Sequence, residues 1–170
     1  MLIYDHEIVV RGYHARCLDE LVRKTQIFKT YIDVFIAAAI IGLIENRKSP
    51  LSKRPGSEDD NPRKIDGEAL RGRSELIDAL YKSIILNSFS DETNVKDKAV
   101  ELLKESSPNP TDKTLFESYV GGGLEYLYEK LILETSENNL TLSIVDLLVK
   151  YYQSQCSVSQ KDLVNLSTPA

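Results

Sequence analysis

Apolar residues recur at the three- and four-residue spacing of an α-helix along most of this chain. The clearest stripe lies between Ser74 and Asn87, where the apolar positions are Leu76, Ile77, Leu80, Tyr81, Ile84 and Ile85. A matching stripe between His14 and Thr25 is flanked by charged residues, which is typical of an amphipathic surface helix. The pattern therefore predicts helices over residues 14–25, 31–45, 74–87, 95–103, 111–132 and 141–155.

The helix predicted over residues 31–45 is apolar on almost every side. Thr30 and Asp33 at its start have the spacing of a capping box, in which each side chain can bond the other residue's backbone amide. Its small residues, three alanines and Gly42, permit close approach of another backbone. We expect it to be the central helix, with these side chains buried: Phe35, Ile36, Ala39, Ile40 and Leu43.

Two other segments complete the predicted fold. Residues 7–11 are rich in β-branched side chains and end at Gly12, which predicts one short N-terminal strand. Residues 50–67 contain three prolines and two glycines with little to bury, which predicts a mobile loop. The sequence thus predicts an all-α class, a compact domain of five or six helices over residues 1–155, with 50–67 as a flexible insert. A polar C-terminal tail follows at 156–170.

Composition excludes several classes of protein. The 170 residues are 42% hydrophobic with a formal net charge of −5, values typical of one globular domain. The longest apolar run, Val34 to Ile44, is about half the roughly 20 residues that a membrane-spanning helix needs. The N-terminus lacks the pattern of a secretory signal, and Cys17 and Cys156 are too few for a disulfide framework. We therefore expect a cytoplasmic protein with no membrane segment.

Charge is distributed unevenly along the chain. Residues 1–54 contain nine basic and six acidic residues, or +3, whereas residues 55–170 contain twelve and twenty, or −8. The basic excess gathers just after the central helix, at Arg47, Lys48, Lys53 and Arg54. Such a cluster can bind a phosphate backbone or an acidic protein surface, or it can simply be a solvated loop.

No combination of residues in the sequence forms a recognisable catalytic or metal-binding motif. His6, His14 and Cys17 lack the spacing of a zinc site, and Cys17 falls on an apolar stripe. Carboxylates such as Glu125 and Glu129 follow helical surface patterns, which favours a solvated face over a paired acid and base. We therefore expect no metal, no cofactor and no enzymatic activity.

Three consecutive glycines, Gly121 to Gly123, interrupt the helix predicted over residues 111–132. Their flanks do not match a phosphate-binding loop. They cost roughly 2 to 3 kcal/mol of helix propensity relative to alanine, so a close packing contact or a bend is expected there. That contact is either with another part of this chain or with a partner, and the second alternative predicts a partner interface at Tyr119, Gly121, Gly122, Gly123 and Tyr126.

The order strand, helix, turn and capped helix over residues 7–45 resembles that of ribbon-helix-helix DNA-binding proteins. The resemblance implies a dimer in which Glu7, Val9 and Arg11 face the major groove, while Lys29 and Thr30 meet a phosphate at a helix start. Glu7 and Val9 are poor partners for a polyanion, so this dimeric DNA-binding protein is the alternative function.

A second resemblance covers more of the chain. The segments KTYIDVFIAAAIIGLIENRKSPL (residues 29–51) and FESYVGGGLEYL (residues 116–127) resemble signature stretches of small proteins associated with bacterial DNA phosphorothioation (Dnd) gene clusters. The match departs from that family at Val120, where a small residue is expected, and at the long insert over residues 53–66.

The resemblance to the Dnd-associated family implies an accessory role and supplies no catalytic residues. The predicted function is a noncatalytic accessory subunit of a bacterial anti-phage or DNA-modification and restriction system, docking on a larger ATPase or nuclease. Its expected partners are larger protein subunits of a defence complex, with DNA contacted through that complex and a homo-oligomer left open. The nucleic-acid-binding candidates are Arg11, Lys29, Arg47, Lys48, Lys53 and Arg54.

Overall fold

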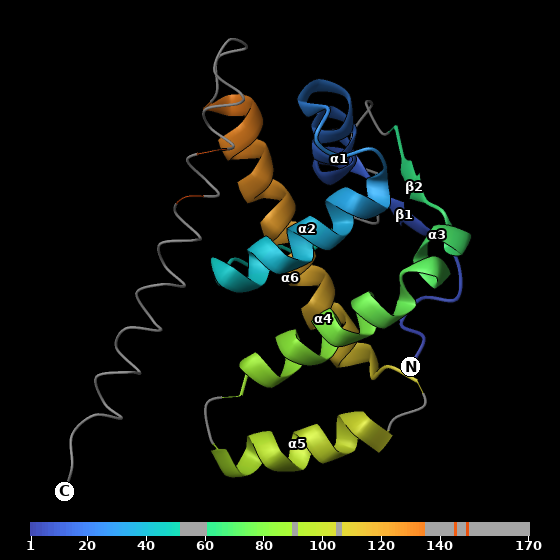
Figure 1. Ribbon diagram of the computed structural model, residues 1–170, viewed down its shortest axis with the longest axis vertical. Helices are drawn as coiled ribbons and strands as arrows, with labels where there is room; N and C mark the ends of the chain where they lie inside the picture. The colour runs from blue at the N-terminus through green and yellow to red at the C-terminus, as the bar shows by residue number, and fades with distance from the viewer. Residues whose placement is uncertain (52–60, 90–91, 105–106, 135–144, 146–148, 150–170) are drawn as a thin grey trace, which may run out of the picture.

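The computed structural model describes residues 1–51, 61–89, 92–104 and 107–134, together with Val145 and Val149. It has the expected all-α class, with one short two-stranded sheet (Figure 1). Its elements in chain order are β1 (Ile8–Val10), α1 (Gly12–Thr25), α2 (Tyr31–Ile44), β2 (Arg63–Ile65), α3 (Gly67–Gly72), α4 (Ser74–Asn87), α5 (Glu92–Lys104), α6 (Pro110–Tyr128) and the π-helical turn η1 (Glu129–Leu133).

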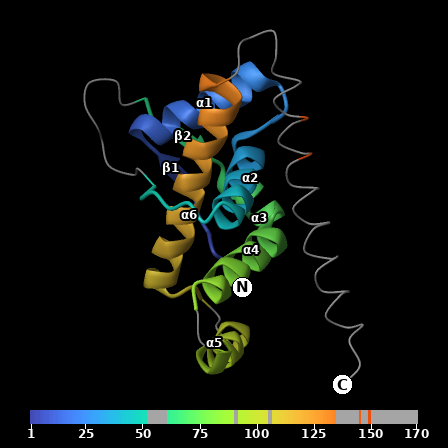
Figure 2. The same ribbon diagram turned by 90° about the vertical axis from the view of Figure 1, so that its left-hand side faces the viewer.

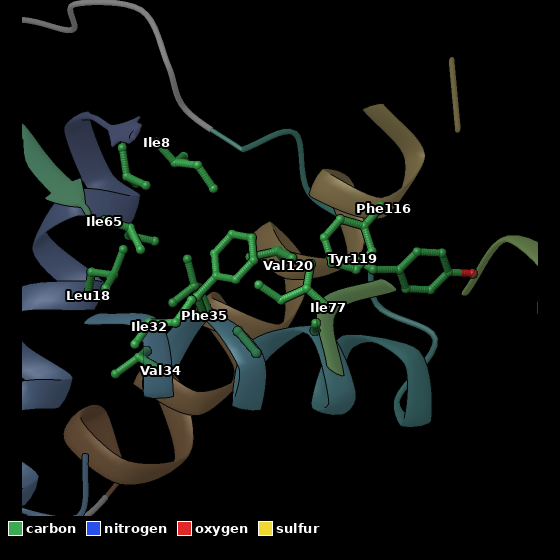
Figure 3. Close-up of a cluster of buried hydrophobic side chains, with 14 of the residues drawn as sticks. Ile8, Leu18, Ile32, Val34, Phe35, Ile65, Ile77, Phe116, Tyr119 and Val120 are labelled. Atoms are coloured by element: carbon green, nitrogen blue, oxygen red, sulfur yellow. The ribbon is translucent and has the colours of Figure 1, made fainter. Parts of the chain in front are cut away.

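Helices α2 and α6 cross at the centre of the molecule, and α1 and α4 pack against them (Figures 1 and 2). Phe35 of α2 lies in one cluster with Phe116 and Val120 of α6 and with Ile77 of α4 (Figure 3). Asp33 accepts hydrogen bonds from the Thr30 backbone N–H (3.1 Å) and hydroxyl (2.7 Å), so the predicted cap of α2 forms. The prediction of a central helix is confirmed.

One face of α2 differs from the prediction. Phe35 and Ala39 are buried as expected, but Ile36 and Leu43 are only half-buried and Ile40 is 36% exposed. The expectation that Ile40 is buried was therefore wrong. The physical reason is that α6, α1 and α4 approach α2 from the other sides, and no other described element packs on this face closely enough to bury it.

The N-terminal strand has its partner in the same chain. β1 pairs antiparallel with β2, with Ile8 opposite Ile65 and Val10 opposite Arg63. Residue Ile65 is buried, and the Lys64 ammonium lies 2.7 Å from the Glu7 carboxylate across the pair. The prediction of a mobile loop over residues 50–67 is therefore wrong for its last part, while residues 52–60 lie outside the described residues.

Helix α6 runs without a break through the three glycines, contrary to the expected interruption. Its N-cap is Asn109, whose side chain accepts from the Thr111 backbone N–H (2.9 Å), with Pro110 as the first helical residue. The helix therefore begins at Pro110, one residue before the start that the sequence predicts. The predicted last helix lies outside the described residues except for Val145 and Val149, and the tail 156–170 lies wholly outside them.

Helix α5 lies at one end of the molecule, beneath α4 in both views (Figures 1 and 2). Leu102 is its buried anchor, and the Lys98 ammonium lies 2.7 Å from Asp112 at the start of α6. Among the described helices, none has the length and apolar character needed to cross a membrane.

Candidate docking site around the basic turn

The basic segment that follows α2 forms a tight turn fixed by backbone hydrogen bonds. Asn46 has a left-handed conformation (φ 48°), which asparagine tolerates better than most residues. The Arg47 N–H donates to the Gly42 carbonyl (2.9 Å), and the Ser49 N–H donates to the Ser118 carbonyl of α6 (2.8 Å). These bonds hold residues 46–49, the basic turn, across the surface of α6.

The three glycines of α6 are the residues on which this turn and α2 rest. A Cβ atom on any of them would overlap a backbone carbonyl of α2 or of the basic turn. The facing pairs are Gly121 with Ser49, Gly122 with Arg47 and Gly123 with Ala38, and Gly42 of α2 similarly faces Tyr119. The two motifs that stood out in the sequence are therefore in direct contact.

The contacts with α2 and the basic turn, which belong to the same chain, explain why glycine occupies these three positions. Gly121, Gly122 and Gly123 are all buried, and so are Tyr119 and Tyr126, which are 1% and 8% exposed. The sequence left open whether the glycines contact another part of this chain or a partner protein. In the structure they contact this chain. A partner cannot touch the glycines while the basic turn covers them, so a docking surface in this region has to consist of the turn and its exposed neighbours.

Arg47 is neutralised by two carboxylates of α6 and η1. Its guanidinium donates two parallel bonds to Glu129, both 2.6 Å, and a third of 3.3 Å to Glu125. The hydrogen bonds from Arg47 lower the pKa of Glu129, and the same bonds raise the pKa of Arg47. Arg47 therefore acts as a clamp between the basic turn and α6, and its charge is not available to a phosphate group.

Glu125 also organises two polar side chains at the buried side of the turn. Ser49 Oγ donates to Glu125 Oε1 (2.6 Å), and Nε2 of His14, which is 3% exposed, lies 3.3 Å from the same oxygen. Burial lowers the pKa of His14, while the Glu125 charge opposes that shift. Because the Ser49 proton points to a carboxylate rather than to the imidazole, this arrangement fixes the turn and does not activate a nucleophile.

Cys17 is the other reactive residue type near this region. Its thiol is fully buried, and burial raises its pKa to about 12. It therefore stays protonated, as expected of a small apolar residue in the core. Among the described residues, no group of three or more His, Cys, Asp or Glu is arranged to hold a metal ion, and His6 lies exposed, away from buried His14.

The remaining predicted nucleic-acid contacts are not brought together. Lys48 is exposed, with its ammonium 4.8 Å from the centre of the Tyr119 ring. Lys29 is exposed at the other end of α2, about 20 Å away by the rise of the helix between them. Arg11 is half-buried at the start of α1, and Lys53 and Arg54 lie outside the described residues.

An exposed surface therefore surrounds the basic turn, and we call it the turn surface. Its residues are Asn46, Lys48 and Pro50, all of them exposed. Sequence reasoning had assigned Glu125 and Glu129 to a solvated face and had not singled out Ser49. The sequence offered one sign of their role. Glu125 and Glu129 lie one helical turn apart after the glycines, on the same helix face as Gly122.

The clamp predicts a pH-dependent contribution to stability. A carboxylate whose folded-state pKa is lowered stabilises the fold above its ordinary pKa and loses that effect as the pH falls through the folded value. We therefore expect Arg47→Gln to lower the free energy of unfolding at pH 7 by up to about 1 kcal/mol, since Glu129 is partly exposed to solvent. Urea unfolding should show the difference shrinking below about pH 4. A difference that is constant with pH would contradict the assignment.

A family model described as DNA sulphur modification system-associated protein 4 matches residues 12–167 of the chain. The matched range begins at the first residue of α1, and it contains both the basic turn and the glycine-bearing helix. No curated protein and no solved structure matches the chain.

Proposed function

Because the chain belongs to the family of DNA sulphur modification system-associated protein 4, we propose that it is a noncatalytic accessory subunit of such a system. In this role it docks on a larger ATPase or nuclease component of the bacterial defence or modification machinery. The family match confirms the resemblance to Dnd-associated proteins that the sequence shows. The family is described as system-associated, which supports an accessory role.

The observation that carries the proposal is the rigid presentation of the turn surface. Backbone contacts with Gly121 and Gly122, two backbone hydrogen bonds and the Arg47 clamp all hold the same four-residue turn. A surface fixed in advance loses little conformational entropy on binding, which favours affinity. Among the named turn residues, Arg47 is neutralised internally while Lys48 is exposed, so the fitting occupant is a protein surface with acidic groups at that position.

The polar groups beneath the turn support a noncatalytic role. Ser49, Glu125, Glu129 and Arg47 bond to one another, and each of these bonds links α6 or η1 to the basic turn. A catalytic group has to keep a proton or an electron pair available to a substrate. These side chains instead direct their hydrogen-bonding atoms towards each other.

In this proposal, DNA is contacted by the complex and not by this chain alone. Lys48 and Lys29 lie at opposite ends of α2, and Arg47 is paired, so these three candidates do not form one continuous phosphate-binding surface. The alternative of a ribbon-helix-helix-like dimer loses its main support, because β1 pairs with β2 of its own chain and buries Ile8 and Val10. We therefore expect the isolated protein to show no salt-dependent binding to duplex DNA.

A pull-down with a matched control tests the docking proposal. The tagged full chain is expressed with the other proteins of its DNA sulphur modification gene cluster, as wild type, Lys48→Glu and Lys104→Glu. Lys104 is exposed at the end of α5, far from the turn, so it controls for a change of net charge. We expect Lys48→Glu to reduce recovery of the larger subunit by about tenfold, which corresponds to 1.4 kcal/mol, and Lys104→Glu to leave it unchanged.

Two results of that pull-down would contradict the proposal. Equal recovery with both variants would show that the turn surface is not the docking site. Recovery of no larger protein by the wild type, from cells shown to contain the other components, would remove the accessory role itself.

A further inference from the structure

The side of α2 that faces away from α6 carries a row of isoleucines. Ala38 and Gly42 contact α6 through their backbones, and Ile40, two residues from each, lies on the opposite side of the helix (Figure 1). Ile40 and Ile44, one helical turn apart, are 36% and 48% exposed. Ile36, one turn earlier, is half-buried. We call these three isoleucines the α2 ridge.

The α2 ridge has the form that a second helix can pack against. Side chains four residues apart make a ridge that fits between the side-chain rows of a neighbouring helix. Ala37, half-buried beside the row, is too small to hinder that approach. From Ile36 to Ile44 the ridge is about 12 Å long, or rather more than two helical turns. Single exposed apolar residues are ordinary on a protein surface, whereas a row on three successive turns is the pattern by which helices recognise one another.

The exposed charges at the two ends of α2 are both positive. Lys29 precedes the helix and Lys48 follows it, about 20 Å apart. The acidic residues between them, Asp33 and Glu45, are half-buried, and Asp33 already accepts two cap bonds from Thr30. The complementary surface is therefore an apolar helix face with an acidic group near each end.

A second copy of this chain does not match that charge pattern. Two copies of α2 packed antiparallel would bring Lys29 of one copy beside Lys48 of the other, at both ends of the contact. Packed in parallel, they would bring each lysine beside its own counterpart. Like charges placed together across an interface disfavour it, so the pattern favours a partner of different sequence.

We propose that the α2 ridge binds an amphipathic helix of the larger subunit, about four turns long, with its apolar face on the isoleucines and an acidic residue near each end. This inference rests on the proposed function, because it adds a second contact to docking through the turn surface. Lys48 belongs to both contacts, whereas Lys29 and the α2 ridge belong only to this one. Variants of Lys29 and of the ridge therefore test the inference separately from Lys48→Glu.

Co-expression and pull-down of the complex give the first test. The tagged full chain carries Ile44→Gln or Lys29→Glu, with Leu103→Gln as the apolar control and Lys104→Glu as the charge control. Leu103 is 78% exposed and lies on α5. We expect Ile44→Gln and Lys29→Glu each to reduce recovery of the larger subunit by about tenfold and both controls to leave it unchanged. Thermal unfolding should show the melting temperature of all four variants close to that of the wild type.

The pull-down separates failure of this inference from failure of the proposed function. Normal recovery with Ile44→Gln and Lys29→Glu, together with loss of recovery in Lys48→Glu, would overturn the inference and leave the turn surface as the docking site. Recovery of no larger subunit by the wild type would remove the proposed function and this inference with it.

Photo-crosslinking identifies the occupant of the α2 ridge without a destabilising variant. The photoreactive amino acid p-benzoylphenylalanine replaces Ile40, or Leu103 as the control, in the full chain within the complex, and mass spectrometry identifies the crosslinked peptide. We expect the Ile40 position to capture a segment of the larger subunit with apolar residues three or four apart and acidic residues beside them. A crosslink from Ile40 to a second copy of this chain, or to another part of the same chain, would overturn the proposal.

Discussion

Replacing Gly123 by alanine is expected to lower the free energy of unfolding by about 2 kcal/mol or more. The added methyl group would overlap the Ala38 carbonyl of α2 and press on the Gly42 amide. Both are backbone atoms inside a helix, so they cannot move aside as the end of a flexible side chain could. Alanine also raises helix propensity by about 1 kcal/mol, so the collision has to exceed that gain before any loss is measured.

Gly72→Ala is the matched control for this prediction. Gly72 also lies in a helix with φ in the ordinary range, but a Cβ atom there meets nothing within 4 Å. Urea or thermal unfolding should therefore show Gly72→Ala to be neutral or slightly stabilising. A Gly123→Ala protein as stable as the wild type would refute the backbone contact between α2 and α6, and with it the internal explanation of the glycines.

Truncation of Phe35 to alanine is expected to have a still larger effect, a loss of about 3 to 5 kcal/mol. Phe35 is fully buried in α2, with its ring edge-on to Tyr4 at 5.9 Å and tilted against Phe116 at 6.1 Å between centroids. Neither neighbour can collapse into the space without leaving its own contacts. The expected result is a large drop in the denaturant midpoint or failure to fold at 37 °C.

Ile40→Ala on the same helix tests whether the large effect expected of Phe35→Ala comes from the burial of that side chain or from a sensitivity of α2 to any truncation. Ile40 is 36% exposed on the face of α2 that the other described elements do not bury, so its truncation should cost about 1 kcal/mol or less. If the two variants were equally destabilised, α2 would be buried on all sides, as its composition alone had suggested.

The sequence predicts local features of this fold well and long-range pairings poorly. The bounds of α2 and α4 follow from the Thr30 cap and from regular apolar spacing, which are properties of neighbouring residues. β2 was missed because its three residues, Arg63 to Ile65, form a strand only through pairing with β1, more than fifty residues earlier. No local pattern distinguishes such a strand from an extended loop.

At the candidate docking site, too, the sequence predicts local features but not long-range contacts. The sequence marked both the basic turn and the three glycines as unusual, but it could not show that they face one another across 70 residues. It also assigned Glu125 and Glu129 to solvent, because an acidic pair on a helix usually lies there. Their role became visible only when the fold placed Arg47 against them.

A complementation assay tests the central claim, accessory function through the turn surface, most directly. Cells that carry the DNA sulphur modification gene cluster but lack this gene receive the wild-type chain, Lys48→Glu, Lys104→Glu or Ser49→Ala, and the function of the system is measured. The account predicts that Lys48→Glu fails like the empty vector despite normal stability, while Lys104→Glu and Ser49→Ala restore function. Full activity of Lys48→Glu, together with loss of activity in a stably folded Ser49→Ala protein, would contradict it and indicate a chemical role for the residues beneath the turn.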